Sequence, residues 1–190
     1  MFWGTELYPR ICGVDVKQLT NCRFGMMYWA IASFSCIMKA VELNDGVLPP
    51  AIFVSGMLQY VYILKFFQWE AGYLSSIDIM QDHAGYYLCW GCLVYVPTVY
   101  TSMTVFMVQN HAYLDGHWGW AMLIFAAGLS MIWLNYDMDE QRARFRRTNG
   151  AAKVWGRTPQ YIIAKYTTAD GEERRSLLLL SGYWGMARHF

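Results

Sequence analysis

The amino-acid sequence predicts an all-α polytopic membrane protein with a small polar segment after its last membrane span. Three observations predict this class. The 190-residue chain is 56% hydrophobic and only 15% charged, whereas soluble domains carry roughly 25% charged residues. Aromatic residues make up 17% of the chain, including nine Trp and fourteen Tyr, which are typical of the membrane–water boundary. The long apolar stretches also lack the polar faces that a soluble helical bundle needs.

Four apolar stretches are long enough, or nearly so, to cross a membrane, which takes about 20 residues. The first two cover residues 24–41 and 48–67. The third covers 85–108 and contains Pro97, so a kink or a broken helix is expected there. The fourth covers 118–136 and has Trp and Tyr residues at its two ends.

The last third of the chain carries most of the positive charge, since ten of the fifteen Lys and Arg lie from Asp137 onward. We therefore divide the chain into a transmembrane core, 1–136, and a cytoplasmic-side segment, 137–190. Residues 137–147 are expected to continue the fourth helix into water. Asp170-Gly171, between two β-capable runs, predicts a short β-hairpin.

Basic residues mark the cytoplasmic side of a membrane protein. If the basic tail is cytoplasmic, four crossings also place residues 1–23 in the cytoplasm. The connections 42–47 and 109–117 would then be lumenal, and neither contains Lys or Arg. The charge distribution therefore predicts one consistent orientation.

The connection between the second and third spans carries Glu70, Asp78, Asp82 and His83. Ionisable groups so near a membrane are costly unless they face a polar cavity or a partner, so these residues are site candidates. The alternative is a solvated loop in which Asp82 caps the following helix. The pattern alone does not choose between them.

Four arginines follow the fourth span, in the stretch "RARFRR" at residues 142–147. They fit a marker of the cytoplasmic helix end. Arg142 and Arg146 are also spaced i, i+4 on one helix face, where they can clamp a phosphate together, whereas Arg144 and Arg147 point elsewhere. Cys89 and Cys92 form a CxxC without a second ligand pair, so no metal site is predicted.

Several spaced motifs occur in a fixed order along the chain. They are "GTELYPR" (4–10), "DIMQDHAGYYLCWG" (78–91), "FRRTNG" (145–150), "VWGRTP" (154–159), "YTTADG" (166–171) and "SGYWGMARHF" (181–190). In this order they resemble the sterol reductases of the endoplasmic reticulum, and the second block and the tail are more similar to the Δ7-reductases of that family than to its Δ14-reductases. The chain differs from the family pattern at Tyr8, where Asn is usual, and at Cys92, where Asp is usual.

The resemblance implies a multi-pass membrane enzyme of the endoplasmic reticulum that uses NADPH to reduce the C7=C8 double bond of a Δ5,7-sterol. Its partners would be the sterol and membrane lipid, with no nucleic acid. The family's NADPH contacts fall on Arg142, Arg146, Leu179 and Trp184. Two alternatives stay open: a Δ14-sterol reductase, and a non-catalytic sterol-binding or scaffold protein of the same fold.

The resemblance further implies that these 190 residues are an internal part of a longer protein, inactive by itself. Reduction of the diene also needs an acid that protonates the second carbon. The candidates, in order of preference, are Asp82, His83 and Asp78, followed by Glu70 and Tyr100.

Overall fold

The computed structural model describes residues 2–74, 76–110, 114, 116–167 and 171–187, without the side chains of residues 77 and 78. It divides into two compact units, Met1–Ser130 and Met131–Phe190. We describe each unit by itself.

The first membrane helix begins well before its apolar stretch. A two-residue hairpin, β1 (Arg10–Ile11) with β2 (Val14–Asp15), leads into α1 (Val16–Gln18), the π-helical segment η1 (Leu19–Gly25) and α2 (Met26–Leu43). The Asp15 side chain caps the helix by accepting a hydrogen bond from the Gln18 backbone N–H at 2.9 Å. The predicted span at 24–41 is confirmed as the apolar part of a helical stretch that runs over Val16–Leu43.

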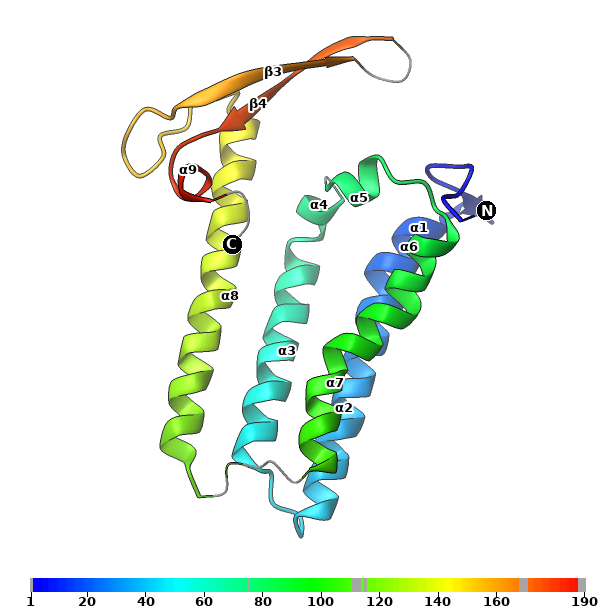
Figure 1. Cartoon of the computed structure of the whole chain (residues 1–190), viewed down its shortest axis with the longest axis vertical. Helices are drawn as coiled ribbons and strands as arrows, with labels where there is room; N and C mark the ends of the chain where they lie inside the picture. The colour runs from blue at the N-terminus through cyan, green and yellow to red at the C-terminus, as the bar shows by residue number, and fades with distance from the viewer. Residues whose placement is uncertain (1, 75, 111–113, 115, 168–170, 188–190) are drawn as a thin grey trace. The chain divides into compact units, whose positions relative to one another are not determined.

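The second and third spans are joined by short helices. In order, the elements are α3 (Pro50–Gln68), α4 (Glu70–Tyr73), α5 (Ile77–Met80), α6 (Tyr86–Trp90), the π-helical segment η2 (Gly91–Tyr95) and α7 (Val96–Gln109). Helix α2 packs against both α3 and α7 (Figure 1). The expected interruption of the third span is present, but it is a π-helical segment before Pro97 and not a kink at Pro97 itself. Pro97 is the second residue of α7, inside the continuous helical stretch Tyr86–Gln109, so the helical hydrogen bond that its missing N–H would make is absent directly after the π-helical segment.

Helices α2, α3 and α7 are joined by apolar contacts and by one polar network. Trp29 donates its indole N–H to Gln59 Oε1 at 2.7 Å, and Gln59 Nε2 donates to Thr104 Oγ1 at 2.7 Å. Thr104 is also 3.1 Å from the Ser55 hydroxyl. Such hydrogen bonds hold membrane helices together because hydrocarbon offers these groups no other partner.

The fourth span is the long helix α8 (Trp118–Arg147), which continues without a break past its apolar part. Its 30 residues rise about 45 Å, which exceeds the roughly 30 Å of a bilayer's hydrocarbon core. The expected continuation of the fourth span beyond Tyr136 is therefore confirmed. Four helices among the described residues are long and apolar enough to cross a membrane.

The second unit contains the end of α8, a β-hairpin and a short helix. Strand β3 (Tyr161–Thr167) pairs antiparallel with β4 (Glu173–Leu179), with Tyr161 opposite Leu179, and α9 (Tyr183–Met186) follows. The predicted hairpin is confirmed, although residues 168–170 of its turn lie outside the described part. Phe145, Val154 and Leu179 form the buried core that fixes the hairpin to α8.

Candidate functional site

Arg142 and Trp184, two of the predicted cofactor residues, lie against each other. The Arg142 guanidinium carbon is 4.3 Å from the centre of the Trp184 ring, a distance at which cation and ring attract. The Trp184 indole N–H donates to the Met138 carbonyl at 3.0 Å. The structure thus brings together an arginine of α8 and a tryptophan of α9 that are far apart in the sequence.

Leu179 and Arg146, the other two predicted cofactor residues, have different environments. Leu179 is 8% exposed and belongs to the buried core with Phe145 and Val154, against which Trp184 also packs. Arg146 is exposed, and no described carboxylate forms an ion pair with it. Arg142, in contrast, has Asp139 at 3.5 Å.

Helix α9 is also tied to α8 by contacts that the sequence patterns did not indicate. The Tyr183 backbone N–H donates to Gln141 Oε1 at 3.2 Å, and the Tyr183 hydroxyl donates to Asp137 Oδ2 at 2.9 Å. This hydrogen bond to a carboxylate favours the neutral phenol and raises the pKa of Tyr183 above its ordinary value.

The loop that carries Asp82 and His83 is bound by the N-terminal segment. The Ala84 N–H donates to the Glu6 carbonyl at 3.0 Å, and the Tyr87 N–H donates to the Phe2 carbonyl at 3.3 Å. A Cβ at Gly85 would collide with the Phe2 carbonyl oxygen, so only glycine permits this approach. Asp82 is half-buried and His83 is exposed.

Asp82 does not cap the following helix, so the capping part of the alternative is wrong. The N-cap residue of α6 is Gly85, and no side chain bonds to that cap. The backbone of this region instead bonds to the N-terminal segment, which leaves the Asp82 carboxylate with no capping role. The side chain of Asp78 lies outside the described part of the chain.

Lys17 is fully buried and supports the same loop. Its Nζ donates to the Ile79 carbonyl at 2.6 Å and also to the Asp82 carbonyl. The Tyr8 ring lies 4.9 Å from the ammonium group, and Tyr8 is one of the two departures from the family pattern. No sequence pattern had singled out Lys17.

The two π-helical segments meet at a small aromatic cavity. Asn21 of η1 accepts a hydrogen bond from Cys92 of η2, and a Cβ at Gly25 would lie 2.6 Å from the Cys92 carbonyl oxygen. The cavity, about 160 Å³, is lined by these two polar residues and by aromatic rings that include Trp29 and Tyr100. Interruptions of this kind in a helix occur frequently at functional sites.

Tyr100 is therefore an acid candidate whose side chain lines this cavity. Its ring stacks on Trp29 with centroids 4.8 Å apart. Asn21 also donates to the Lys17 carbonyl at 2.7 Å, so one set of bonds leads from the Asp82 loop through Lys17 to the cavity. Glu70, another acid candidate, forms an ion pair with Arg23 at 2.9 Å.

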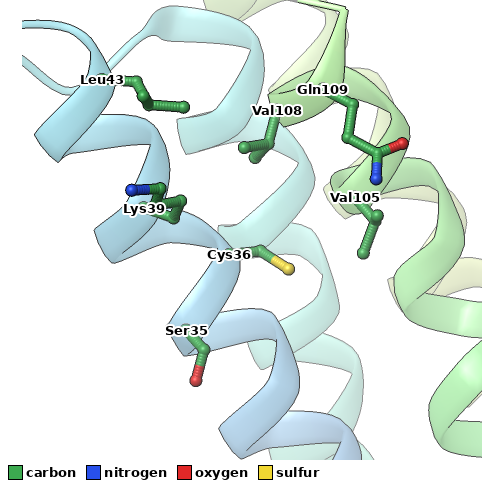
Figure 2. Close-up of a pocket in the computed structure, with 7 residues that line it drawn as sticks. All are labelled: Ser35, Cys36, Lys39, Leu43, Val105, Val108 and Gln109. Atoms are coloured by element: carbon green, nitrogen blue, oxygen red, sulfur yellow. The ribbon is translucent and has the colours of Figure 1, made fainter.

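A second cavity lies between α2 and α7, near the ends of these helices. It measures about 450 Å³, and Figure 2 shows its lining, which includes Ser35, Cys36, Lys39 and Gln109. Lys39 is already paired with Glu42 at 3.1 Å. Since the lining contains no carboxylate and no histidine, this cavity supplies none of the acid candidates.

Four membrane-length helices, with a polar network between three of them, define a multi-pass membrane protein. Comparison with known proteins then gives the family. The chain belongs to the ergosterol biosynthesis ERG4/ERG24 family, whose model matches residues 1–190.

Several curated relatives are similar to the chain over nearly its whole length. It is 51% identical over 190 residues to a protein of Arabidopsis thaliana named 7-dehydrocholesterol reductase, and 38% identical over 187 residues to one of the same name from Xenopus laevis. It is 35% identical over 188 residues to a Delta(14)-sterol reductase of Methylotuvimicrobium alcaliphilum. The chain spans 43%, 39% and 41% of the length of these three proteins.

Proposed function

We propose that the chain forms the central part of an NADPH-dependent reductase that reduces the C7=C8 double bond of a Δ5,7-sterol in the endoplasmic reticulum membrane. The observation that carries the proposal is the 51% identity, over all 190 residues, to a protein named 7-dehydrocholesterol reductase. Identity is lower to proteins named Delta(14)-sterol reductase, at 35% for that of Methylotuvimicrobium alcaliphilum and 30% for one from Dictyostelium discoideum. A Δ14-reductase is therefore the second candidate.

The arginines at the end of α8 fit a nucleotide phosphate. Arg142 is oriented by the Trp184 ring, and Arg146 is exposed on the same face of the helix. Guanidinium groups bind phosphate oxygens with paired, charge-assisted hydrogen bonds. In this proposal Arg142 and Arg146 bind the cofactor phosphates, while Leu179 supports Trp184 from the core.

The reaction transfers a hydride and a proton to the double bond, and NADPH supplies the hydride when bound. The chain must supply the proton and exclude water while positive charge develops on the sterol. Asp82 and His83 are the preferred donors. Tyr100 is the alternative, since its ring borders the aromatic cavity.

The aromatic cavity by itself admits only part of a sterol. Its volume is about 160 Å³, whereas pockets for ligands of drug size measure roughly 300–1,000 Å³. The proposed sterol site is therefore larger than this cavity, which would hold one portion of the ring system against Trp29 and Tyr100.

The test uses the full-length protein in membranes that lack other sterol reductases. The membranes are incubated with 7-dehydrocholesterol or with a Δ8,14-sterol, each with NADPH or NADH, and the products are identified by gas chromatography and mass spectrometry. We expect loss of the C7=C8 double bond with NADPH. Reduction of only the Δ8,14-sterol would identify a Δ14-reductase, and binding of both sterols without reduction would identify a non-catalytic protein.

A further inference from the structure

We propose that a cavity between α8 and residues 152–155 binds the phosphate group of an acidic membrane lipid. The cavity measures about 190 Å³ and lies wholly in the second unit. Its lining includes Arg144, Lys153 and Trp155, together with the carboxylates of Asp137 and Glu140.

This cavity is separate from the proposed cofactor site. Successive residues of an α-helix are rotated by about 100° about its axis. Arg142 and Arg144 are two residues apart, so they project from nearly opposite sides of α8. Residues 137, 140, 141 and 144 share one face of α8 and line the cavity. Arg142 and Arg146 lie on the other face, where Trp184 covers Arg142.

The lining keeps a net positive charge. Glu140 is balanced by its ion pair with Arg147, and Asp137, which accepts the hydrogen bond of the Tyr183 hydroxyl, offsets only one of the two positive charges of Arg144 and Lys153. No described carboxylate forms an ion pair with Arg144 or Lys153. An arginine and a lysine that face one small cavity are suited to phosphate oxygens.

The backbone at Trp155 gives an independent reason to expect a ligand. Trp155 has φ +49° and Gly156 has φ +76°, and two hydrogen bonds of 2.9 and 3.0 Å between Val154 and Arg157 close the turn. Two successive positive φ values define a turn that normally holds Asn, Asp or Gly. A bulky residue there is strained, and such strain is typical of functional positions.

The strained turn presents the Trp155 ring to solvent. The side chain is 58% exposed, and its ring makes an edge contact with Tyr183, with centroids 5.0 Å apart. Tryptophans of membrane proteins are enriched at the level of the lipid headgroups. The ring therefore has the position expected of an anchor beside a bound headgroup.

The position of the cavity along α8 favours a lipid as the source of the phosphate. The apolar stretch of this helix ends at Tyr136, and the lining begins at Asp137. Residues 137–144 rise about 10 Å, which corresponds to the headgroup layer that borders the hydrocarbon core. Basic pockets at this depth bind acidic headgroups.

The experiment measures binding of a fluorescent phosphatidic acid to the full-length protein in phosphatidylcholine nanodiscs. The cavity variant is Arg144→Gln with Lys153→Gln. The control is Lys165→Gln with Arg174→Gln, which removes the same charge from the exposed hairpin. We expect about tenfold weaker binding for the cavity variant, from the loss of charge-assisted contacts, and little change for the control. Equal binding by the two variants would overturn the proposal.

Two further arms complete the test. Inorganic phosphate that displaces the lipid would identify a soluble phosphate compound as the source, whereas failure to displace it supports a lipid. Trp155→Gly removes the strain of the turn, so this variant should bind the lipid more weakly without melting at a lower temperature. A lower melting temperature with unchanged lipid binding would mean that the ring only packs, which would contradict the role given to Trp155.

Discussion

At the scale of single residues, Lys17 connects the two parts of the first unit that carry acid candidates. A buried ammonium group is costly unless polar groups surround it, and here carbonyl oxygens of Ile79 and Asp82 accept its hydrogen bonds. Its own carbonyl accepts a hydrogen bond from Asn21 at the aromatic cavity. Lys17 therefore positions the Asp82 loop relative to that cavity.

Lys17→Met should destabilise the protein and release the loop. The substitution keeps the length of the side chain but removes hydrogen bonds from a charged donor, each of which contributes about 1.5–3 kcal/mol. We expect a lower melting temperature and faster hydrogen exchange in residues 76–85. Lys39→Met is the matched control, because Lys39 is exposed and paired only with Glu42 and such pairs contribute about 0–1 kcal/mol. Equal effects of the two substitutions would contradict the role of Lys17.

Arg146→Ala should weaken NADPH binding in the full-length protein. We expect KM for NADPH to rise about tenfold, because a charge-assisted phosphate contact of about 1.5–3 kcal/mol is lost. Steady-state kinetics with NADPH as the varied substrate measure this effect. Arg147→Ala provides the comparison, since Arg147 is paired with Glu140. If both substitutions raised KM equally, the arginine cluster would be only a marker of topology.

At the scale of the elements, the polar network fixes how α2, α3 and α7 meet. Gln59 of α3 bonds to Trp29 of α2 and to Thr104 of α7. A close approach of α2 and α3 at Gly56 accompanies it, because a Cβ there would collide with Ile37. Small residues and interhelical hydrogen bonds together determine packing where lipid weakens the hydrophobic effect.

Gln59→Leu should destabilise this helix packing by roughly 0.6–2 kcal/mol, the range of interhelical hydrogen bonds in membranes. The substitution leaves the Trp29 indole N–H without its acceptor, so the stacking of Trp29 on Tyr100 should loosen as well. Thermal unfolding in detergent measures the loss. A double-mutant cycle with Thr104→Val should show coupling between the two positions, and strictly additive effects would mean that they act independently.

The order of the four membrane-length helices followed from hydropathy, because a crossing helix needs a long apolar run wherever it lies. The hairpin followed from Asp170-Gly171 between two β-capable runs, since turn residues act locally. The π-helical segments η1 and η2 could not be predicted, because amino-acid composition does not determine whether a backbone N–H bonds to the carbonyl four or five residues earlier. Pro97 indicated an interruption of the third span, but the contact of η1 with η2 decides its position.

The candidate site was predictable to a similar degree. The i, i+4 spacing placed Arg142 and Arg146 on one face of α8, and the family resemblance added Trp184. The roles of Lys17 and Asn21 depend on partners 62 and 71 residues away in the sequence. No local pattern contains such contacts, so these two residues were found only in the structure.

At the scale of the whole molecule, the four crossings predict that both ends of the chain face the cytoplasm. Asp45→Cys in the connection after α2 should resist a membrane-impermeant maleimide in sealed microsomes, whereas Asn149→Cys should react. Both residues are exposed in turns, where an impermeant reagent can reach them from the solvent on their own side. Labelling is compared with that of the unsubstituted protein, because these 190 residues already contain five cysteines. The reverse pattern would invert the orientation.

The π-helical segments also determine which changes in chain length the protein tolerates. The turn at Gly91–Tyr95 holds one residue more than an α-helical turn, because its backbone N–H groups bond to carbonyls five residues back. Removing one residue there would let this segment close into an ordinary α-helical turn, so α7 would nearly keep its rotation relative to α6 and only the contact of Cys92 with Asn21 would change. Removing one residue from α7 between Val96 and Tyr100 would instead rotate the rest of that helix by about 100°, so that Tyr100 would leave Trp29 and Thr104 would leave Gln59. This second deletion is more harmful than an added residue in the exposed turn at Asn44–Val47. The spacing between motifs in this chain is a structural constraint as strict as the motifs themselves.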